Sequence, residues 1–232
     1  MRKKLNKFIN RMRISSLEKQ PKVFCISMQR TGTTSTGQFF KDHGLRWSGW
    51  GSDKRNNWSQ LWALCDYESI FASEEFRLAN AYEDSPWWYS KFYEELYKRF
   101  PDAKFILLKR DPSKWYKSVL SRAQDGVMGA VNTHCMNYAR EAELNQLIEA
   151  GTPQKQLTSV SGEKPMSMKN MEEHYTTCYL EHFDNATEFF NKNQPDALYA
   201  GELEDPKKWQ KIGHFLGIDV ADDYESHKND GH

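Results

Sequence analysis

The sequence has no long apolar run, no surplus of charge and no cysteine pair at a spacing typical of metal or redox sites. Basic and acidic residues number 32 each, so no global field attracts nucleic acid, and an anionic ligand must be held by local positive groups. Four isolated cysteines, Cys25, Cys65, Cys135 and Cys178, are typical of reduced structural thiols. Neither a membrane-length apolar segment nor the apolar core of a signal peptide occurs. These absences predict a cytoplasmic protein without a nucleic-acid partner.

The length of the chain sets its domain organisation. Its 232 residues are enough for one α/β domain with its own core and too few for two full ones. We expect three parts: a basic amphipathic segment over 1–20, a single domain over 21–218, and a loose polar tail over 219–232. No internal repeat interrupts this plan.

The N-terminal segment MRKKLNKFINRMRISS places Leu5, Phe8, Ile9 and Met12 at helical spacing, with basic residues between them. Such a stretch can lie on an anionic membrane surface, which would be a weak peripheral contact through residues 1–16. The alternative, which we favour, is a first helix packed on its own domain or a frayed basic tail, because most amphipathic helices are half-buried.

Apolar runs of strand length alternate with segments of helical periodicity along the rest of the chain. Strands are expected at 22–27, near 82–84, at 104–109 and at 196–203. Helices are expected at 33–43, 86–100, 112–123, 131–150, 168–193 and 205–218, and the polar stretch 150–168 is expected to be a long loop. This alternation predicts a three-layer α/β/α fold with a central parallel sheet of four or five strands, in which 22–27 and 104–109 are neighbours.

A threonine-rich turn in FCISMQRTGTTSTGQFF joins the first strand to the first helix, which is where phosphate-binding loops occur. The P-loop of nucleotide triphosphatases needs a glycine, four residues and then Gly-Lys-Ser/Thr. Here Ser27 stands at the first glycine position and Thr33 at the lysine position. A later strand ends in Lys109 and Arg110, where a magnesium-binding aspartate would be needed.

Anion binding is nevertheless favoured at this turn. Backbone N–H groups and hydroxyls over 31–34 lie at a helix N-terminus, and Arg30 adds positive charge. A ligand with phosphate-like oxygens and no metal fits best.

Two motifs together resemble those of sulfotransferases that use 3′-phosphoadenosine 5′-phosphosulfate (PAPS). QRTGTTS, residues 29–35, resembles the 5′-phosphosulfate loop of that family in its bacterial-type Arg-Thr-Gly-Thr form. RDPSKWYKS resembles the 3′-phosphate element, in which an arginine at a strand end is followed eight positions later by a serine; these are Arg110 and Ser118 here. ALYAGELEDPKKWQKIGHFLGI also resembles the last strand and helix of the family, so the resemblance covers most of 22–218.

The resemblance implies a P-loop nucleotide-kinase-like fold and a metal-free reaction. A sulfuryl group would move from PAPS to a hydroxyl or amine of an unidentified small-molecule or carbohydrate acceptor by in-line displacement, leaving adenosine 3′,5′-bisphosphate. The phosphosulfate would be cradled by Arg30, Thr31, Gly32, Thr33, Thr34 and Ser35, and the 3′-phosphate by Arg110 and Ser118. Arg30 replaces the usual lysine of the family and would stabilise charge on the leaving phosphate.

The catalytic base is expected in YEDSP, residues 82–86, which resembles the short strand that delivers this group in several branches of the family. Asp84 is our choice and Glu83 the second, because alternate strand residues face opposite sides and only one can point at the groove. His134 is a third candidate. An N-cap role for Asp84 before Pro86 is the structural alternative.

Two other functions stay open at the level of sequence. A small-molecule kinase of the same plan would require the missing lysine and a magnesium carboxylate. A binding module that retains the nucleotide groove without chemistry would need neither.

Overall fold

A five-stranded parallel sheet forms the centre of the protein, whose structure, a computed structural model, describes residues 2–124 and 126–226. The strand order is β2-β3-β1-β4-β5. The strands are β1 (Val23–Cys25), β2 (Trp47–Ser48), β3 (Ala81–Tyr82), β4 (Lys104–Lys109) and β5 (Leu198–Glu202). β1 pairs with β4 in parallel, with Val23 opposite Lys104. The predicted sheet and the predicted pairing of its two central strands are therefore confirmed.

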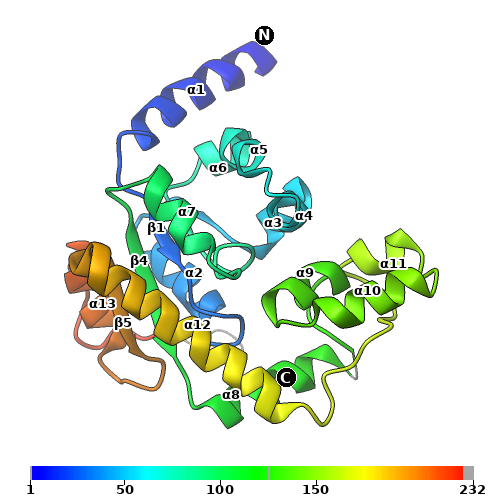
Figure 1. Ribbon diagram of the computed structural model, residues 1–232. Helices are drawn as coiled ribbons and strands as arrows, with labels where there is room; N and C mark the ends of the chain where they lie inside the picture. Colours follow the sequence, from blue (N-terminus) through cyan, green and yellow to red (C-terminus); the bar gives the residue numbers. More distant parts are fainter. Residues whose placement is uncertain (1, 125, 227–232) are drawn as a thin grey trace.

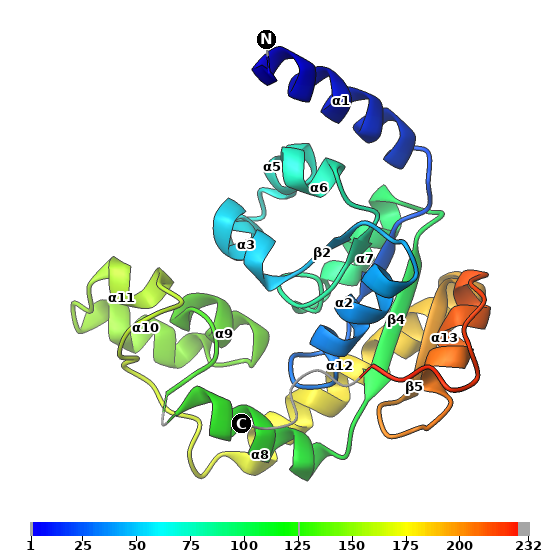
Figure 2. The same cartoon turned by 180° about the vertical axis from the view of Figure 1, so that it is seen from behind.

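Helices cover both faces of the sheet (Figures 1 and 2). They are α1 (Arg2–Leu17), α2 (Thr33–Asp42), α3 (Trp50–Asn56), α4 (Trp58–Ala63), α5 (Tyr67–Ala72), α6 (Glu74–Arg77), α7 (Phe92–Arg99), α8 (Pro112–Ala123), α9 (Val131–Asn137), α10 (Glu141–Glu149), α11 (Gln154–Thr158), α12 (Glu172–Asn193) and α13 (Lys208–Leu216), with a 3-10 turn at Pro195–Ala197.

Alternation along the strands divides the core into two layers. Val23 and Cys25 of β1 face α2 and α13, where Phe39 and Trp209 are fully or almost fully buried. Phe24, between them in sequence, belongs to the larger aromatic cluster that includes side chains of α7, α8 and α12. The sheet is therefore buried on both faces, as parallel sheets usually are.

Two of the expected helices differ from the structure because burial prevails over periodicity. The helix expected at 86–100 begins only at Phe92, since the preceding turn buries Trp87 and Trp88 in the core. The helix expected at 131–150 is two helices, α9 and α10, broken where Tyr138 and Arg140 turn inward. The expected long loop at 150–168 contains the short helix α11.

The N-terminal helix α1 extends away from the rest of the molecule (Figure 1). Ile14 and Leu17 are buried, whereas Ile9 and Met12 are 37% and 61% exposed. The expectation that the apolar stripe packs on the domain therefore fails for Ile9 and Met12, because at about 100° per residue they lie on another side of the helix from Ile14 and Leu17. Membrane contact through residues 1–16 stays a prediction. Among the described helices, none combines the length and apolar character needed to cross a membrane.

The end of the described chain packs against the domain instead of hanging loose. Tyr224 contacts the rings of Phe39 and His43 at 5.8 and 4.8 Å between centroids. The hydroxyl of Ser226 donates to the carbonyl oxygen of Ser35 at 3.0 Å. Tyr224 and Ser226 thus pack along α2, the first near its C-terminal end and the second at Ser35 near its N-terminus. The rest of the predicted tail, 227–232, lies outside the described residues.

Candidate active site

The two phosphate motifs meet at the carboxyl ends of β1 and β4. Nη1 of Arg110 donates to the carbonyl oxygen of Arg30 at 3.4 Å, and Nε of Arg30 donates to the hydroxyl of Ser118 at 2.9 Å. A cavity of about 1330 Å³ opens at this edge, where open α/β sheets bind their ligands. Figure 2 shows β4 leading into α8 here, which places Arg110 and Ser118 on consecutive elements.

Glycine is required at the turn before α2. Gly32 has φ of 80°, in the left-handed region, and a Cβ there would lie 2.6 Å from Cδ1 of Leu203. The turn directs the N-terminus of α2 toward the cavity, whose lining includes Arg30, Gly32, Thr33, Thr34 and Ser35. This end of a helix carries the positive part of its dipole, so it favours an anionic group.

Thr31 departs from the predicted cradle. Its hydroxyl and its backbone N–H both donate to the carbonyl oxygen of Met28, and its side chain is fully buried away from the cavity. Thr31 therefore holds the shape of the loop.

Positive charge gathers around the loop. The lining of the cavity includes five cationic side chains, Arg30, Arg110, Arg122, Lys164 and Lys208. Burial lowers the pKa of Arg30, and the charges of Arg110 and Arg122 lower it further. Such a cluster of like charges favours a polyanionic ligand that carries charge at two or more points.

Sequence reasoning missed three of these cations and two acids of the cavity lining, Glu204 and Glu225. Arg122 follows Ser118 by one turn of α8, and this spacing of four residues was a usable signal. Lys164 and Lys208 come from distant segments without such a signal. Glu204 forms an ion pair with Arg110 at 3.6 Å, just beyond the end of β5.

Both carboxyl groups of YEDSP line the cavity, so the prediction that only one faces it is wrong. Alternation holds only within extended strand, and β3 ends at Tyr82. Asp84 has φ of 65°, which breaks the alternation and turns its carboxylate to the same side as that of Glu83.

Asp84 lies half-buried in the wall of the cavity. Its Oδ1 accepts a hydrogen bond from the backbone N–H of Ser85 at 2.7 Å. Burial is the main cause that raises the pKa of Asp84 to about 6; the charge of Asp53 acts in the same direction, while the hydrogen bond from Ser85, the charge of Arg30 and a hydrogen bond from Thr33 lower it. Because α7 begins only at Phe92, Asp84 caps no helix. The carboxylate is ionised at neutral pH and can accept a proton.

Glu83 precedes Asp84 in the sequence, but its surroundings and its pKa shift differ from those of Asp84. It is only 3% exposed, and it packs so closely on Gly49 that a Cβ there would overlap its Oε1. Burial, followed by the charge of Asp84, raises the pKa of Glu83 well above its ordinary value. Both causes disfavour the ionised form of Glu83, so it is less suited than Asp84 to serve as a base.

His134 lines the cavity, but both its ring nitrogens are engaged. Nδ1 lies 3.3 Å from the carbonyl oxygen of Met128, to which it donates, and Nε2 lies 2.7 Å from the hydroxyl of Tyr175. Nη1 of Arg140 donates to that hydroxyl at 2.6 Å, which leaves the tyrosine proton for His134. Burial and the charge of Arg140 lower the pKa of His134 to about 3. The histidine therefore links α9 to α12 as a neutral group.

Two comparisons with known proteins give a match. The sequence model of the sulfotransferase domain matches residues 22–232. Among solved structures, a sulfotransferase from Alicyclobacillus acidocaldarius superposes with a TM-score of 0.46 at 14% identity, over 90% of this chain and 84% of that chain. No curated protein sequence matches the chain. The match of the domain over almost the whole chain shows that this protein belongs to the sulfotransferase family.

Proposed function

We propose that the protein transfers a sulfuryl group from PAPS to a hydroxyl or amine of an acceptor by in-line displacement. The observation that carries this proposal is the meeting of the two motifs, in which Arg30 contacts both Arg110 and Ser118. A donor with phosphate groups at the 5′ and 3′ positions of one nucleoside needs two anion sites that are close together. The edge of the sheet at β1 and β4 offers such a pair.

The donor would bind across the loop and the start of α8. The 5′-phosphosulfate would lie at the N-terminus of α2, against Gly32, Thr33, Thr34 and Ser35. The 3′-phosphate would lie between Arg110 and Ser118, with Arg122 one helical turn away. Guanidinium groups and the helix end supply the positive charge, so this mode of binding requires no metal.

The chemistry would use Asp84 and Arg30 on either side of the transferred group. As the acceptor oxygen forms its bond to sulfur, its proton passes to the carboxylate of Asp84. The bond from sulfur to the phosphate oxygen breaks, and its electron pair stays on adenosine 3′,5′-bisphosphate. Arg30 and the N-terminus of α2 stabilise the negative charge that develops on that phosphate.

The acceptor would occupy the remainder of the cavity. Its volume of about 1330 Å³ exceeds the range of roughly 300–1,000 Å³ that is usual for one small ligand, so donor and acceptor have room together. The lining beyond the carboxyl groups combines polar side chains with apolar and aromatic ones, the latter including Trp47, Trp50, Trp88, Val127, Met128 and Val160. A small molecule or a carbohydrate with a ring face fits this wall.

The donor assignment can be tested through the 3′-phosphate. Arg110→Ala and Ser118→Ala should each reduce the preference for PAPS over adenosine 5′-phosphosulfate, measured as the ratio of their dissociation constants. A charge-assisted hydrogen bond commonly contributes about 1.5–3 kcal/mol, or roughly ten- to a hundredfold in binding. Lys114→Ala removes an exposed cation from the same helix, outside the cavity lining, and serves as the matched control. An unaltered preference in both variants would place the 3′-phosphate elsewhere.

A further inference from the structure

Helix α3 carries a buried carboxylate that the proposed chemistry does not use. Asp53 is 4% exposed and accepts three hydrogen bonds, each of 2.6 Å. Two come from the backbone N–H and the hydroxyl of Ser59, at the start of α4. The third comes from the hydroxyl of Ser85. Asp53 therefore joins two helices to the turn that follows β3.

That turn holds the proposed base. The backbone N–H of Ser85 donates to Asp84, while its hydroxyl donates to Asp53, so one serine connects the two carboxylates. Asp84 has a left-handed φ of 65°, a conformation that residues other than glycine adopt only when their surroundings hold them. The hydrogen bond from Ser85 to Asp53 is a contact that can supply this restraint.

Asp53 also reaches a second side chain of the cavity wall. The hydroxyl of Ser59 lies 2.8 Å from the hydroxyl of Tyr89, which lines the cavity together with Ser85. Burial raises the pKa of Tyr89, and the charge of Asp53 raises it further, so the phenol stays protonated.

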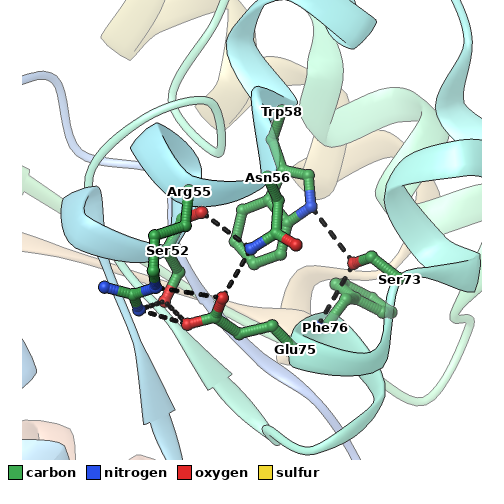
Figure 3. A network of polar contacts seen from close by, with 7 residues as sticks. All are labelled: Ser52, Arg55, Asn56, Trp58, Ser73, Glu75 and Phe76. Atoms are coloured by element: carbon green, nitrogen blue, oxygen red, sulfur yellow. Dashed lines mark hydrogen bonds and ion pairs between the residues drawn. The ribbon is translucent and has the colours of Figure 1, made fainter.

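Helix α3 is itself anchored on its outer side (Figure 3). Glu75 of α6 accepts hydrogen bonds from Ser52 at 2.6 Å and from Asn56 at 2.5 Å, and it forms an ion pair with Arg55. These three partners flank Asp53 along the helix. Glu75 thus anchors the helix that carries Asp53. Asp53 is therefore held in place independently of Asp84.

We propose that Asp53 is a positioning residue for the catalytic base, holding the carboxylate of Asp84 at the cavity wall through Ser85. This inference rests on the proposed function only in calling Asp84 the base. The contacts from Asp53 to Ser85 and from Ser85 to Asp84 do not depend on it.

The charge of Asp53 also affects the pKa of Asp84. This effect can be measured, and it distinguishes positioning of the base from simple structural support. The titratable or charged groups that face Asp84 are Glu83, Asp53, Tyr89 and Arg30. Burial raises the pKa of Asp53, while its hydrogen bonds from Ser59 and Ser85 lower it, and the charge of its ionised form opposes ionisation of Asp84. Asp53→Asn keeps the shape of the side chain but removes that charge, so the pKa of Asp84 should fall below its wild-type value.

The test is a ¹³C NMR titration of the full chain labelled at aspartate carboxyl carbons, with Asp84→Asn used to identify the Asp84 signal. In Asp53→Asn the midpoint of that signal should move to lower pH. Asp66→Asn removes an exposed helix-capping carboxylate from α5, and it should leave the midpoint unchanged. An unchanged midpoint in Asp53→Asn would overturn the proposal.

A second measurement uses ³⁵S-labelled PAPS with an extract of the host as the source of acceptor. Ser85→Ala breaks the link but leaves both carboxylates, and it should lower the initial rate of labelling by about 10- to 100-fold, as small misplacements of reacting groups do. Its dissociation constant for adenosine 3′,5′-bisphosphate should stay within about twofold of wild type, since a factor of two is only about 0.4 kcal/mol. A wild-type rate in Ser85→Ala would refute positioning. If wild type labels nothing, the proposed function fails, while the titration still decides the link between Asp53 and Asp84.

Discussion

Asp84 and Glu83 are neighbouring carboxyl groups with different surroundings. Both line the cavity, but Glu83 is enclosed by Gly49 and Trp47, whereas Asp84 is half-buried and faces Arg30. Burial raises the pKa of both groups, but the hydrogen bond from Ser85 and the charge of Arg30 lower that of Asp84, whereas the charge of Asp84 raises that of Glu83. Such differences in surroundings are the usual way that a site assigns one group as acid and another as base.

We predict that Asp84→Asn inactivates the enzyme while stabilising its fold. Loss of a general base commonly reduces turnover by about 10²–10⁴-fold, and donor affinity should stay nearly constant. The pKa of Asp84 is raised from 3.8 to about 6 on folding, so its contribution to stability is present below pH 3.8 and lost as the pH rises through about 6. At pH 8 the variant should be more stable by on the order of 3 kcal/mol, and at pH 3 the difference should vanish.

Urea unfolding at the two pH values and turnover with labelled PAPS measure both effects. Glu83→Gln is the control, and its effect should be mild because burial and the charge of Asp84 disfavour the ionised form of Glu83. Wild-type turnover in Asp84→Asn, together with a loss in Glu83→Gln or His134→Ala, would move the base to another residue and leave the donor site untouched.

At the scale of elements, α2 packs against β2 through a glycine. A Cβ on Gly37 would lie 2.5 Å from Nε1 and 2.8 Å from Cε2 of the Trp47 ring. Because Gly37 has no side chain, α2, which begins at the loop 29–35, can approach β2, which leads into α3. The loop and the carboxyl groups are thereby brought to the same cavity.

Gly37→Ala should therefore destabilise the protein although alanine is the better helix former. Propensity alone would stabilise by about 1 kcal/mol, but overpacking against a rigid ring typically costs about 1–3 kcal/mol. Gly51→Ala in α3 is the matched control, since its Cβ would meet only the flexible end of Arg55 at 3.3 Å. Urea melts should show a lower midpoint for the first variant alone. Equal stabilisation of both would mean that the ring moves aside freely.

At the scale of the whole molecule, basic and acidic residues are equal in number, yet several cations lie together in one cavity. The chain has no net charge, and five cations and four acidic side chains line one cavity at the edge of the sheet. A polyanion bound there would be recognised by the placement of these charges and not by the overall field.

Adenosine 3′,5′-bisphosphate should raise the melting temperature without added metal. A ligand at 100 times its dissociation constant stabilises by about 2.7 kcal/mol, which corresponds to roughly 5–10 °C for a domain of this size. ATP with magnesium should give little or no shift, because Thr33 stands where a P-loop kinase has its lysine. The opposite pattern, with a magnesium-dependent shift by ATP and none by the bisphosphate, would support the kinase alternative.

Several features could be predicted from the sequence because they depend on short spacings. Apolar runs of strand length placed β1 and β4, and their parallel pairing follows from the helices between them. A lone glycine before a helix marked the turn at Gly32, where the left-handed φ is required. Arg110 at a strand end and Ser118 two helical turns later were visible as one motif. In each case, the residues that indicate the feature lie within about ten positions of one another in the sequence.

Only the tertiary structure decided which groups surround that motif and which of them are charged. Lys208, Asp53 and Tyr175 come from segments distant in sequence, and no local spacing connects them to the loop. Desolvation, which raises the pKa values of Glu83 and Asp84 and lowers that of His134, depends on every atom packed around a group. This dependence on packing also explains why residues 86–91 are not helical and why the helix expected at 131–150 is broken at 138–140. There the burial of aromatic and arginine side chains prevails over helical periodicity.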